Sequence, residues 1–101
     1  MADWNLFRTF LAVADVRSYS AAGRRLKLSH ATVGRHVTEL ERSLGTKLFV
    51  RDADGYSLTP AGERLSAIVN DFIDALGTAL DELKADEGHT ALRVEMLPSL
   101  A

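Results

Sequence analysis

The stretch SYSAAGRRLKLSHATVGRHVTELERSLGTKLFVRDADGYSLTPAG, residues 18–62, decides the fold of this 101-residue chain. It begins with a short Ala-rich amphipathic segment, continues through a tight turn into a basic segment that starts with a serine, and ends in two short β-prone runs. The apolar residues of the two amphipathic segments recur at helical spacing. This order of elements predicts a helix-turn-helix followed by a β wing, an arrangement that reads duplex DNA.

The basic segment predicts a helix of about residues 29–44, because Ser29 suits the position that caps a helix N-terminus. Gly45 is suited to the left-handed conformation that ends a helix. The apolar residues of this segment form a single stripe: Val33, Val37, Leu40 and Leu44. Arg35 lies roughly opposite that stripe, so we expect it to face outward.

The flanking segments complete the predicted domain. Asp3 predicts the start of a first helix that runs through Leu11 or beyond, and Ser18 or Ser20 can cap the second helix. The inward positions expected in the first helix are Phe7, Phe10, Leu11 and Ala14, with Leu6 and Val13 broadening the stripe. Residues 48–51 and 56–58 are strand candidates, and Asp54-Gly55 favours the tight turn between them.

Thr59-Pro60 predicts the start of a long helix, with threonine as the cap and proline at the first helical position. The apolar residues Leu65, Val69, Phe72, Leu76, Ala79 and Leu83 then alternate at spacings of four and three, which is a heptad seam. A helix of this length cannot cover its apolar side against three short helices, so a second copy of the chain is expected. The residues predicted for that dimer interface are Trp4, Leu65, Ile68, Val69, Phe72, Ile73, Leu76, Leu80 and Leu83.

The predicted fold class is therefore mainly α: a winged helix-turn-helix of three helices and a two-stranded wing, followed by a long dimerising helix. The expected domains are residues 1–59 for the DNA-binding domain, 60–88 for the linker helix and 89–101 for the start of a further domain. Within this division, residues 86–90 are interpreted as a linker and 91–97 as a strand.

The charge is divided unequally along the chain, although the formal net charge is only −2. From Arg17 to Arg51, eight basic residues stand against two acidic ones, a local charge of +6. From Glu63 onward, three basic residues stand against eight acidic ones, a local charge of −5. Phosphate affinity responds to the local field, so the first half is suited to an anionic partner.

The N-terminal turns of a helix in the major groove come closest to the base edges. The residues predicted to contact bases are His30, Ala31, Thr32, Arg35 and His36. Arg35 is the strongest of these, because its guanidinium can donate two parallel hydrogen bonds to guanine O6 and N7; a solvated surface charge is the alternative. The residues predicted to contact phosphates are Ser20, Arg24, Arg25, Lys27, Ser29, Lys47 and Arg51. Gly34 either lets the backbone approach a nucleic-acid strand or is simply tolerated within the helix.

Several functions find no support in the composition. The chain has no cysteine, and its three histidines lack metal-ligand spacing, so no metal and no cofactor are predicted. No catalytic residues are predicted, because no nucleophile–base pair, carboxylate pair or phosphate-binding loop is visible. No apolar run approaches the roughly 20 residues needed to span a membrane. The N-terminus does not resemble a signal peptide, so we expect a cytoplasmic, nucleoid-associated protein that makes no membrane contact.

The sequence resembles the N-terminal region of LysR-type transcriptional regulators over nearly its whole length. The resemblance rests on separate motifs in the same order: residues 6–10 (LFRTF), 18–26 (SYSAAGRRL), 40–45 (LERSLG), 48–51 (LFVR) and 58–62 (LTPAG). It implies a bacterial regulator that binds promoter or operator DNA as a homodimer through its linker helix. It also implies a small-molecule effector bound only by a C-terminal domain, most of which lies beyond residue 101.

The resemblance further implies that Ala31, Thr32 and Arg35 lie in the major groove and that the wing, with Arg51, Asp54, Gly55 and Tyr56, approaches the adjacent minor groove. The chain departs from the family at three places: His30 stands where Gln is usual, Gly34 where Ser is usual, and Asp54 where Arg is common. A carboxylate is repelled by the negative potential of the minor groove, so a wing contact falls to Arg51 or Tyr56.

Two other functions are compatible with the sequence. The first is a helical dimerisation module that has lost DNA binding, which Asp54 and the acidic second half favour. The second is a winged-helix regulator of another family, which residues 91–97 argue against because such a protein needs no strand after the long helix. An enzyme is the weakest alternative.

Overall fold

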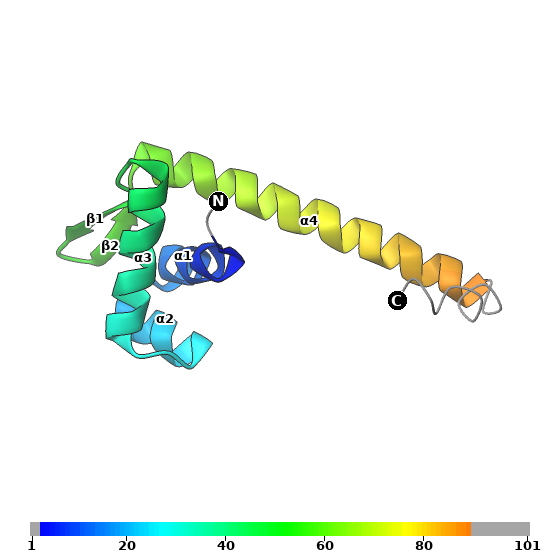
Figure 1. The fold of residues 1–101 in the computed structure, drawn as a ribbon, viewed down its shortest axis with the longest axis horizontal. Coiled ribbons are helices and arrows are strands. Elements are labelled where there is room, and N and C mark those ends of the chain that lie inside the picture. The colour runs from blue at the N-terminus through cyan, green and yellow to red at the C-terminus, as the bar shows by residue number, and fades with distance from the viewer. Residues whose placement is uncertain (1–2, 90–101) are drawn as a thin grey trace. The chain divides into compact units, whose positions relative to one another are not determined.

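The computed structural model describes residues 3–89, and it confirms the mainly α winged helix-turn-helix fold (Figure 1). Three helices come first, then a two-stranded antiparallel sheet, then a long helix. The elements are α1 (Trp4–Val16), α2 (Tyr19–Leu26), α3 (His30–Leu44), β1 (Phe49–Asp52), β2 (Gly55–Leu58) and α4 (Pro60–His89).

Side-chain oxygens cap the first three helices, as the sequence predicts for Asp3 and Ser29. The Asp3 carboxylate accepts from the amide of Asn5 at 3.2 Å, and the hydroxyl oxygens of Ser18 and Ser29 each accept at 3.1 Å from the amide three residues onward. Ser18, not Ser20, is therefore the cap of α2. These bonds satisfy amides that have no partner inside the helix.

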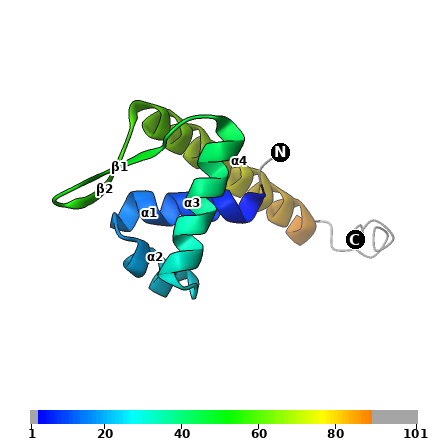
Figure 2. The same cartoon turned by 60° about the vertical axis from the view of Figure 1, so that its left-hand side comes forward.

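The core lies where α1, α2 and α3 pack on one another, and α3 crosses α1 in both views of the molecule (Figures 1 and 2). The buried apolar residues are Leu6, Phe10, Ala12, Val13, Ala22, Val33, Val37, Leu40, Leu48 and Phe49. The face of α1 that packs on the core is therefore rotated relative to the predicted face, because Phe7, Leu11 and Ala14 are only partly buried. At the end of α3, Leu44 is 45% exposed, so the predicted inward stripe ends at Leu40.

The wing is a hairpin that projects from the helices (Figure 2) and pairs Phe49 with Leu58 and Asp52 with Gly55. This register places Ala53 and Asp54 at the turn, so the predicted Asp54-Gly55 turn is shifted by one residue. Gly55 closes the hairpin at φ +115°, where a side chain would also collide with the carbonyl oxygen of Arg17. The amide of Tyr56 donates to that same carbonyl at 3.0 Å, which joins the wing to the end of α1.

Helix α4 begins as predicted, because the Thr59 hydroxyl oxygen accepts from the amide of Gly62 at 3.0 Å. The same hydroxyl donates to the carbonyl of Lys47 at 2.7 Å, so it also holds the segment that leads into the wing. The helix continues to His89, so most of the segment interpreted as a linker is helical. The predicted strand at 91–97 lies outside the described residues.

By its contacts the chain divides into two compact units, residues 1–69 and 70–101, with the division inside α4. Within residues 3–89, no helix combines the length and the apolar character that a membrane crossing requires.

Candidate nucleic-acid interface

The first turns of α3 present a polar, exposed surface. His30, Ala31 and Arg35 are exposed and Thr32 is partly buried, whereas Val33 is fully buried against the core. The outward orientation predicted for Arg35 is therefore what the structure shows. The stripe that faces the core fixes the rotation of α3, and this rotation turns His30, Ala31 and Arg35 to solvent.

A short chain of hydroxyl contacts orders this surface. The Ser29 hydroxyl donates to the Thr32 hydroxyl at 3.0 Å while its oxygen accepts from the Thr32 amide. The Arg35 guanidinium donates to the same Thr32 hydroxyl at 3.4 Å, a long and therefore weak bond. The Arg35 side chain is thus guided along the helix toward its N-terminus and stays free to exchange this bond for a stronger partner.

His36 is turned toward the core. Its Nδ1 lies 2.8 Å from the hydroxyl oxygen of Thr9, a residue of α1 that is 1% exposed. This contact satisfies a buried hydroxyl and links α1 to α3. The prediction that His36 contacts a base is not tested by this geometry, but one of the two ring nitrogens is already engaged inside the protein.

Gly34 faces Tyr19, the first residue of α2. A Cβ at position 34 would lie 3.1 Å and 3.3 Å from two carbons of the Tyr19 ring. The absence of a side chain at Gly34 is therefore explained by packing inside the helix-turn-helix. Neither interpretation made from the sequence, backbone approach to a nucleic-acid strand or simple tolerance, included this contact.

A cleft between the wing and the starts of α2 and α3 brings together several of the predicted DNA contacts. Ser20 of α2, His30 of α3 and Arg51 of β1 all line it. The other lining residues are Arg17, Ser18, Tyr19, Gly55 and Tyr56. Lys47 lines a different pocket, at the far end of α3, so the predicted phosphate contacts do not form a single cluster.

Arg17 holds the wing, a role that the sequence did not indicate. Its Nε donates to the carbonyl of Tyr56 at 3.1 Å, and its guanidinium donates to the Ser57 hydroxyl at 2.6 Å. The same guanidinium lies 3.7 Å from the Asp52 carboxylate. The Ser57 hydroxyl, the Asp54 amide and, more weakly, the Arg17 guanidinium lower the pKa of the Asp52 carboxyl below its usual value.

The basic residues of the first half divide into two groups. Three of them pair with carboxylates: Arg17 with Asp52, Arg25 with Asp15 at 2.7 Å, and Lys47 with Glu41 at 3.6 Å. The others form no ion pair within the described part of the chain: Arg24, Lys27, Arg35, Arg42 and Arg51. The charge available to an anionic partner is therefore smaller than the local +6 indicates.

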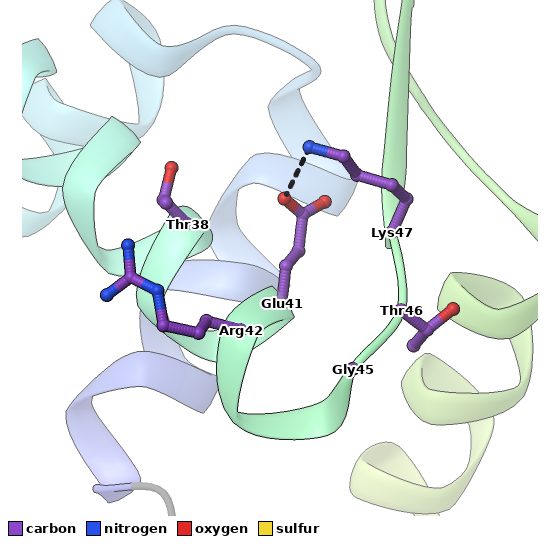
Figure 3. A pocket seen from close by; sticks show the side chains of 6 residues that line it. All are labelled: Thr38, Glu41, Arg42, Gly45, Thr46 and Lys47. Carbon is purple, nitrogen blue, oxygen red and sulfur yellow. Dashed lines mark ion pairs between the residues drawn. The ribbon is translucent and has the colours of Figure 1, made fainter.

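Glu41 organises the loop that leads from α3 to the wing. One of its carboxylate oxygens accepts from the amides of Leu48 and Phe49, at 2.8 Å and 3.4 Å. The other faces the Lys47 ammonium, and Figure 3 shows this ion pair beside the loop at Gly45. The pocket drawn there is lined by Thr38, Glu41, Arg42, Gly45, Thr46 and Lys47.

Arg17, Tyr19 and Glu41 therefore have structural roles that sequence reasoning did not assign. Apart from Gly34 of α3, which faces Tyr19, their partners lie in the wing or its leading loop, 6 to 40 positions away in the chain. No periodicity marks such contacts. The available signal was indirect: Glu41 carries one of only two negative charges in a strongly basic stretch.

The pattern of the bacterial regulatory helix-turn-helix proteins of the lysR family matches residues 4–63, which is more than half of the chain and includes α1 to the start of α4. The chain therefore belongs to the LysR family, and it is a LysR-type helix-turn-helix DNA-binding domain of the kind found in transcription regulators.

Among curated relatives, the chain is 37% identical over 94 residues to the AhcY transcriptional activator HvrB of Rhodobacter capsulatus, covering 93% of this chain and 32% of that protein. It is 32% identical over 97 residues to the transcriptional activator AmpR of Citrobacter freundii, covering 96% and 33%. The chain thus spans about a third of the length of the curated relatives it matches.

Among solved structures, it matches the CbnR DNA-binding domain in its DNA complex with 28% identity and a TM-score of 0.72, over 83% of this chain and 97% of that one. It matches CbnR, a LysR family transcriptional regulator, with 29% identity and a TM-score of 0.71, over 82% of this chain and 29% of that one.

Residues 3–89 contain no group of histidine, cysteine or acidic side chains arranged to hold a metal ion. The arrangement described above is that of a binding surface: an exposed helix face with hydroxyl and guanidinium donors, next to a wing that carries one exposed arginine, Arg51.

Proposed function

We propose that this chain binds double-stranded promoter or operator DNA as a homodimer, with α3 of each copy in the major groove of one half-site of an interrupted palindrome. The observation that carries the proposal is the exposed face at the start of α3, where Arg35 projects from a capped helix. The solved complex of the CbnR DNA-binding domain with DNA, which shares this fold, supports it.

Arg35 is the proposed base-reading residue. A guanidinium in the major groove donates in parallel to guanine O6 and N7, and each such pair discriminates by about 1–3 kcal/mol. Ala31 and Thr32 are short enough to allow close approach and to contact a thymine methyl group. His30 lies beside them on the exposed first turn, whereas the internal bond of His36 makes it the weakest of the five proposed base contacts.

Arg24, Lys27 and Arg51 are the proposed main phosphate contacts, because they form no ion pair within the described residues. Ser20 joins Arg51 in the cleft beside the wing. Ser29 also faces the proposed DNA surface, although its hydroxyl is shared with Thr32. Arg25 and Lys47 have to exchange a carboxylate partner for a phosphate, so we expect smaller contributions from them.

A second copy of the chain is the proposed partner of α4. Phe72, Leu76 and Leu83 of the seam are 55%, 45% and 57% exposed in the single chain. Ile68, Ile73 and Leu80 flank them and are exposed as well, as is Trp4 on α1. Val69 is 7% exposed and Leu65 packs against the core, so the two seam residues nearest the domain serve their own copy.

Regulation by a small-molecule effector is proposed for the whole protein, through a further domain of the kind that the family resemblance implies. Because the proposed partner is chromosomal DNA, a cytoplasmic, nucleoid-associated location is part of the same proposal. The proposed activity is DNA binding and not catalysis, because the hydrogen-bond donors on α3 are suited to recognising a duplex.

Selection of bound sites from a pool of random duplexes, followed by fluorescence polarisation on the selected duplex, tests the proposal. Arg35→Ala is expected to weaken binding roughly 5- to 150-fold, the equivalent of about 1–3 kcal/mol, and to relax the choice of one base pair. Arg8→Ala, an exposed arginine of α1, is the matched control and should change affinity little.

The dependence on salt provides an independent measure. Affinity should fall steeply with salt concentration, because every phosphate contact releases a counterion. Unchanged affinity and selectivity in Arg35→Ala would remove the base-reading role. A chain that dimerises but shows a flat salt response would instead be the dimerisation module without DNA binding, which the exposed Asp54 of the wing favours.

A further inference from the structure

The Tyr19 ring connects the recognition helix to the wing. On one side it lies against Gly34 of α3, where even a Cβ would be 3.1 Å away. It also stacks on the Tyr56 ring of β2, with the ring centroids 4.1 Å apart and the planes 4° from parallel. Tyr19 itself is the first residue of α2, fixed there by the Ser18 cap. A single side chain thus joins the three elements that are proposed to meet DNA.

The stack continues to the cation of the wing. Arg51 pairs with Tyr56 across the hairpin, its guanidinium carbon lies 5.4 Å from the Tyr56 ring centroid, and it donates to the Tyr56 hydroxyl at 3.4 Å. Arg51 is the sole basic residue between Leu48 and Leu58, and the turn carries acidic side chains instead. Any cationic contact from the wing to a phosphate or to the minor groove therefore depends on where Arg51 is held.

We propose that Tyr19 is a positioning residue for DNA recognition: it sets the place of Arg51 relative to α3, acting through Tyr56. This inference rests on the proposed function. A two-stranded hairpin is at best marginally stable alone, so its direction is set by what it packs against. The base of the wing is held by Arg17, by Glu41 and by Phe49, which packs on Phe10 of the core. The Tyr19 ring is the packing partner of Tyr56, the residue that faces Arg51 across the hairpin.

The missing side chain at Gly34 leaves the space that the Tyr19 ring occupies. A methyl group at this position would press on Tyr19 at 3.1–3.3 Å, so the ring must move by a few tenths of an ångström. Glycine inside a helix costs about 1 kcal/mol relative to alanine, and the close approach of Tyr19 accounts for its presence. Partial burial and the neighbouring Tyr56 raise the pKa of Tyr19 to about 12, in agreement with the close stacking of the two rings.

A double-mutant cycle on DNA affinity tests the proposal, with the selected duplex as the probe. Arg51→Gln should lower the salt-dependence slope by about one unit, because one phosphate contact is lost. Tyr19→Leu should lower affinity and slope in the same direction. The double variant should bind within about twofold of Arg51→Gln alone, because Tyr19 acts through Arg51. Tyr19→Phe keeps the stacked ring and should stay within about twofold of the wild type.

Gly34→Ala is a second way to displace the Tyr19 ring. This variant is not expected to unfold the domain, because alanine is a better helix former than glycine. It should weaken binding in the wild-type background and have no further effect with Arg51→Gln. NMR of the free chain gives a readout without DNA: the Arg51 δ-methylene shift, set by the Tyr56 ring, should move in Tyr19→Leu and Gly34→Ala and stay in place in Tyr19→Phe.

Additive losses in the cycle, or an unmoved Arg51 resonance in Tyr19→Leu, would overturn the positioning role while leaving DNA binding intact. A wild-type chain that bound no duplex would overturn the proposed function, and the role of Tyr19 in recognition with it. The two failures are therefore distinguishable.

Discussion

At the scale of single residues, side chains of the same type have different roles: some hold the domain together and others face solvent. Arg17 and Arg35 are both exposed arginines of the basic stretch, yet Arg17 is bound to the wing by two hydrogen bonds and Arg35 holds one weak one. His30 and His36 differ in the same way, because only His36 reaches the buried hydroxyl of Thr9. For the histidines, the division follows from which face of α3 meets α1, whereas Arg17 stands at the end of α1, beside the wing.

Tyr19 leads to a prediction about pH. Burial, followed by the charge and hydroxyl of Tyr56, raises the pKa of Tyr19 from 10.0 to about 12. The unfolded chain loses this proton near pH 10 and the folded chain only near pH 12. Stability from this group is therefore fully present below pH 10 and decreases as the pH rises toward 12.

Thermal unfolding of the wild type and Tyr19→Phe between pH 9 and about 11.5 checks this expectation. The melting temperature of the wild type should fall more steeply with pH than that of Tyr19→Phe, because phenylalanine has no proton to lose. Lysine titration is common to both chains and cancels in the difference. Parallel curves would contradict the raised pKa.

At the scale of elements, the wing is positioned by contacts at both ends of α3. Near its start, Tyr19 and Arg17 hold β2. Near its end, the Glu41 carboxylate accepts from the amide of Leu48, just before β1, and from that of Phe49, the first residue of β1. The Glu41 side chain is 12% exposed, so these bonds are largely shielded from water. Hydrogen bonds and ring contacts therefore connect α3 and the wing at both ends of the helix.

Glu41→Ala is expected to destabilise the domain by about 1–3 kcal/mol, because it leaves the Leu48 and Phe49 amides without an acceptor. Glu41→Gln keeps one carbonyl oxygen and should cost less. Glu39→Ala, an exposed neighbour, should stay within about 0.5 kcal/mol of the wild type. Urea unfolding monitored by circular dichroism gives all three values. Equal losses in Glu41→Ala and Glu39→Ala would show that the carboxylate contributes nothing to the loop.

The sequence predicted most of these elements because their signals are local. Each serine cap, like the terminal Gly45, acts on backbone groups only a few residues away in the chain. The 3.6-residue period of α3 can likewise be recognised within a short stretch of sequence. The shifted face of α1 and the displaced wing turn were missed for a different reason. The rotation of α1 depends on how α3 packs across it, and Gly55 is placed by the carbonyl of Arg17, 38 positions earlier in the chain.

The candidate interface also has parts that local sequence signals predict and parts that depend on contacts between distant segments. Arg35 was assigned from its position opposite an apolar stripe, and the structure places it on the exposed face. The cleft between Ser20, His30 and Arg51 joins three elements that only the tertiary fold brings together. The ion pairs that occupy Arg17, Arg25 and Lys47 also link separate elements, so charge counted along the sequence overstated the available field.

At the scale of the whole molecule, α4 carries apolar side chains beyond those that its own domain uses. Leu65 and Val69 pack on the winged domain, whereas the later seam residues stay exposed. A heptad pattern on an exposed helix face is typical of a coiled-coil contact. Dimerisation would also explain how one chain with one α3 reads a site of two halves.

Leu76→Glu is expected to break this contact, because two carboxylates would be forced into an apolar seam without partners. Breaking a buried arrangement in this way costs about 3 kcal/mol or more, so the dimer dissociation constant should rise at least about 100-fold. Sedimentation velocity at micromolar concentration measures it. Thr78→Glu, on the opposite side of the helix, is the control and should remain dimeric. A wild-type monomer under these conditions would contradict the proposed dimer.

The contact of Gly34 with Tyr19 also has an evolutionary consequence. Two positions that share one small volume are not free to drift separately, so among relatives of this chain a bulkier residue at 34 should be accompanied by a slimmer one at 19. A pair of substitutions that grafts this arrangement onto a relative would then have to be made together, since either change alone would leave a gap or a clash in the same place.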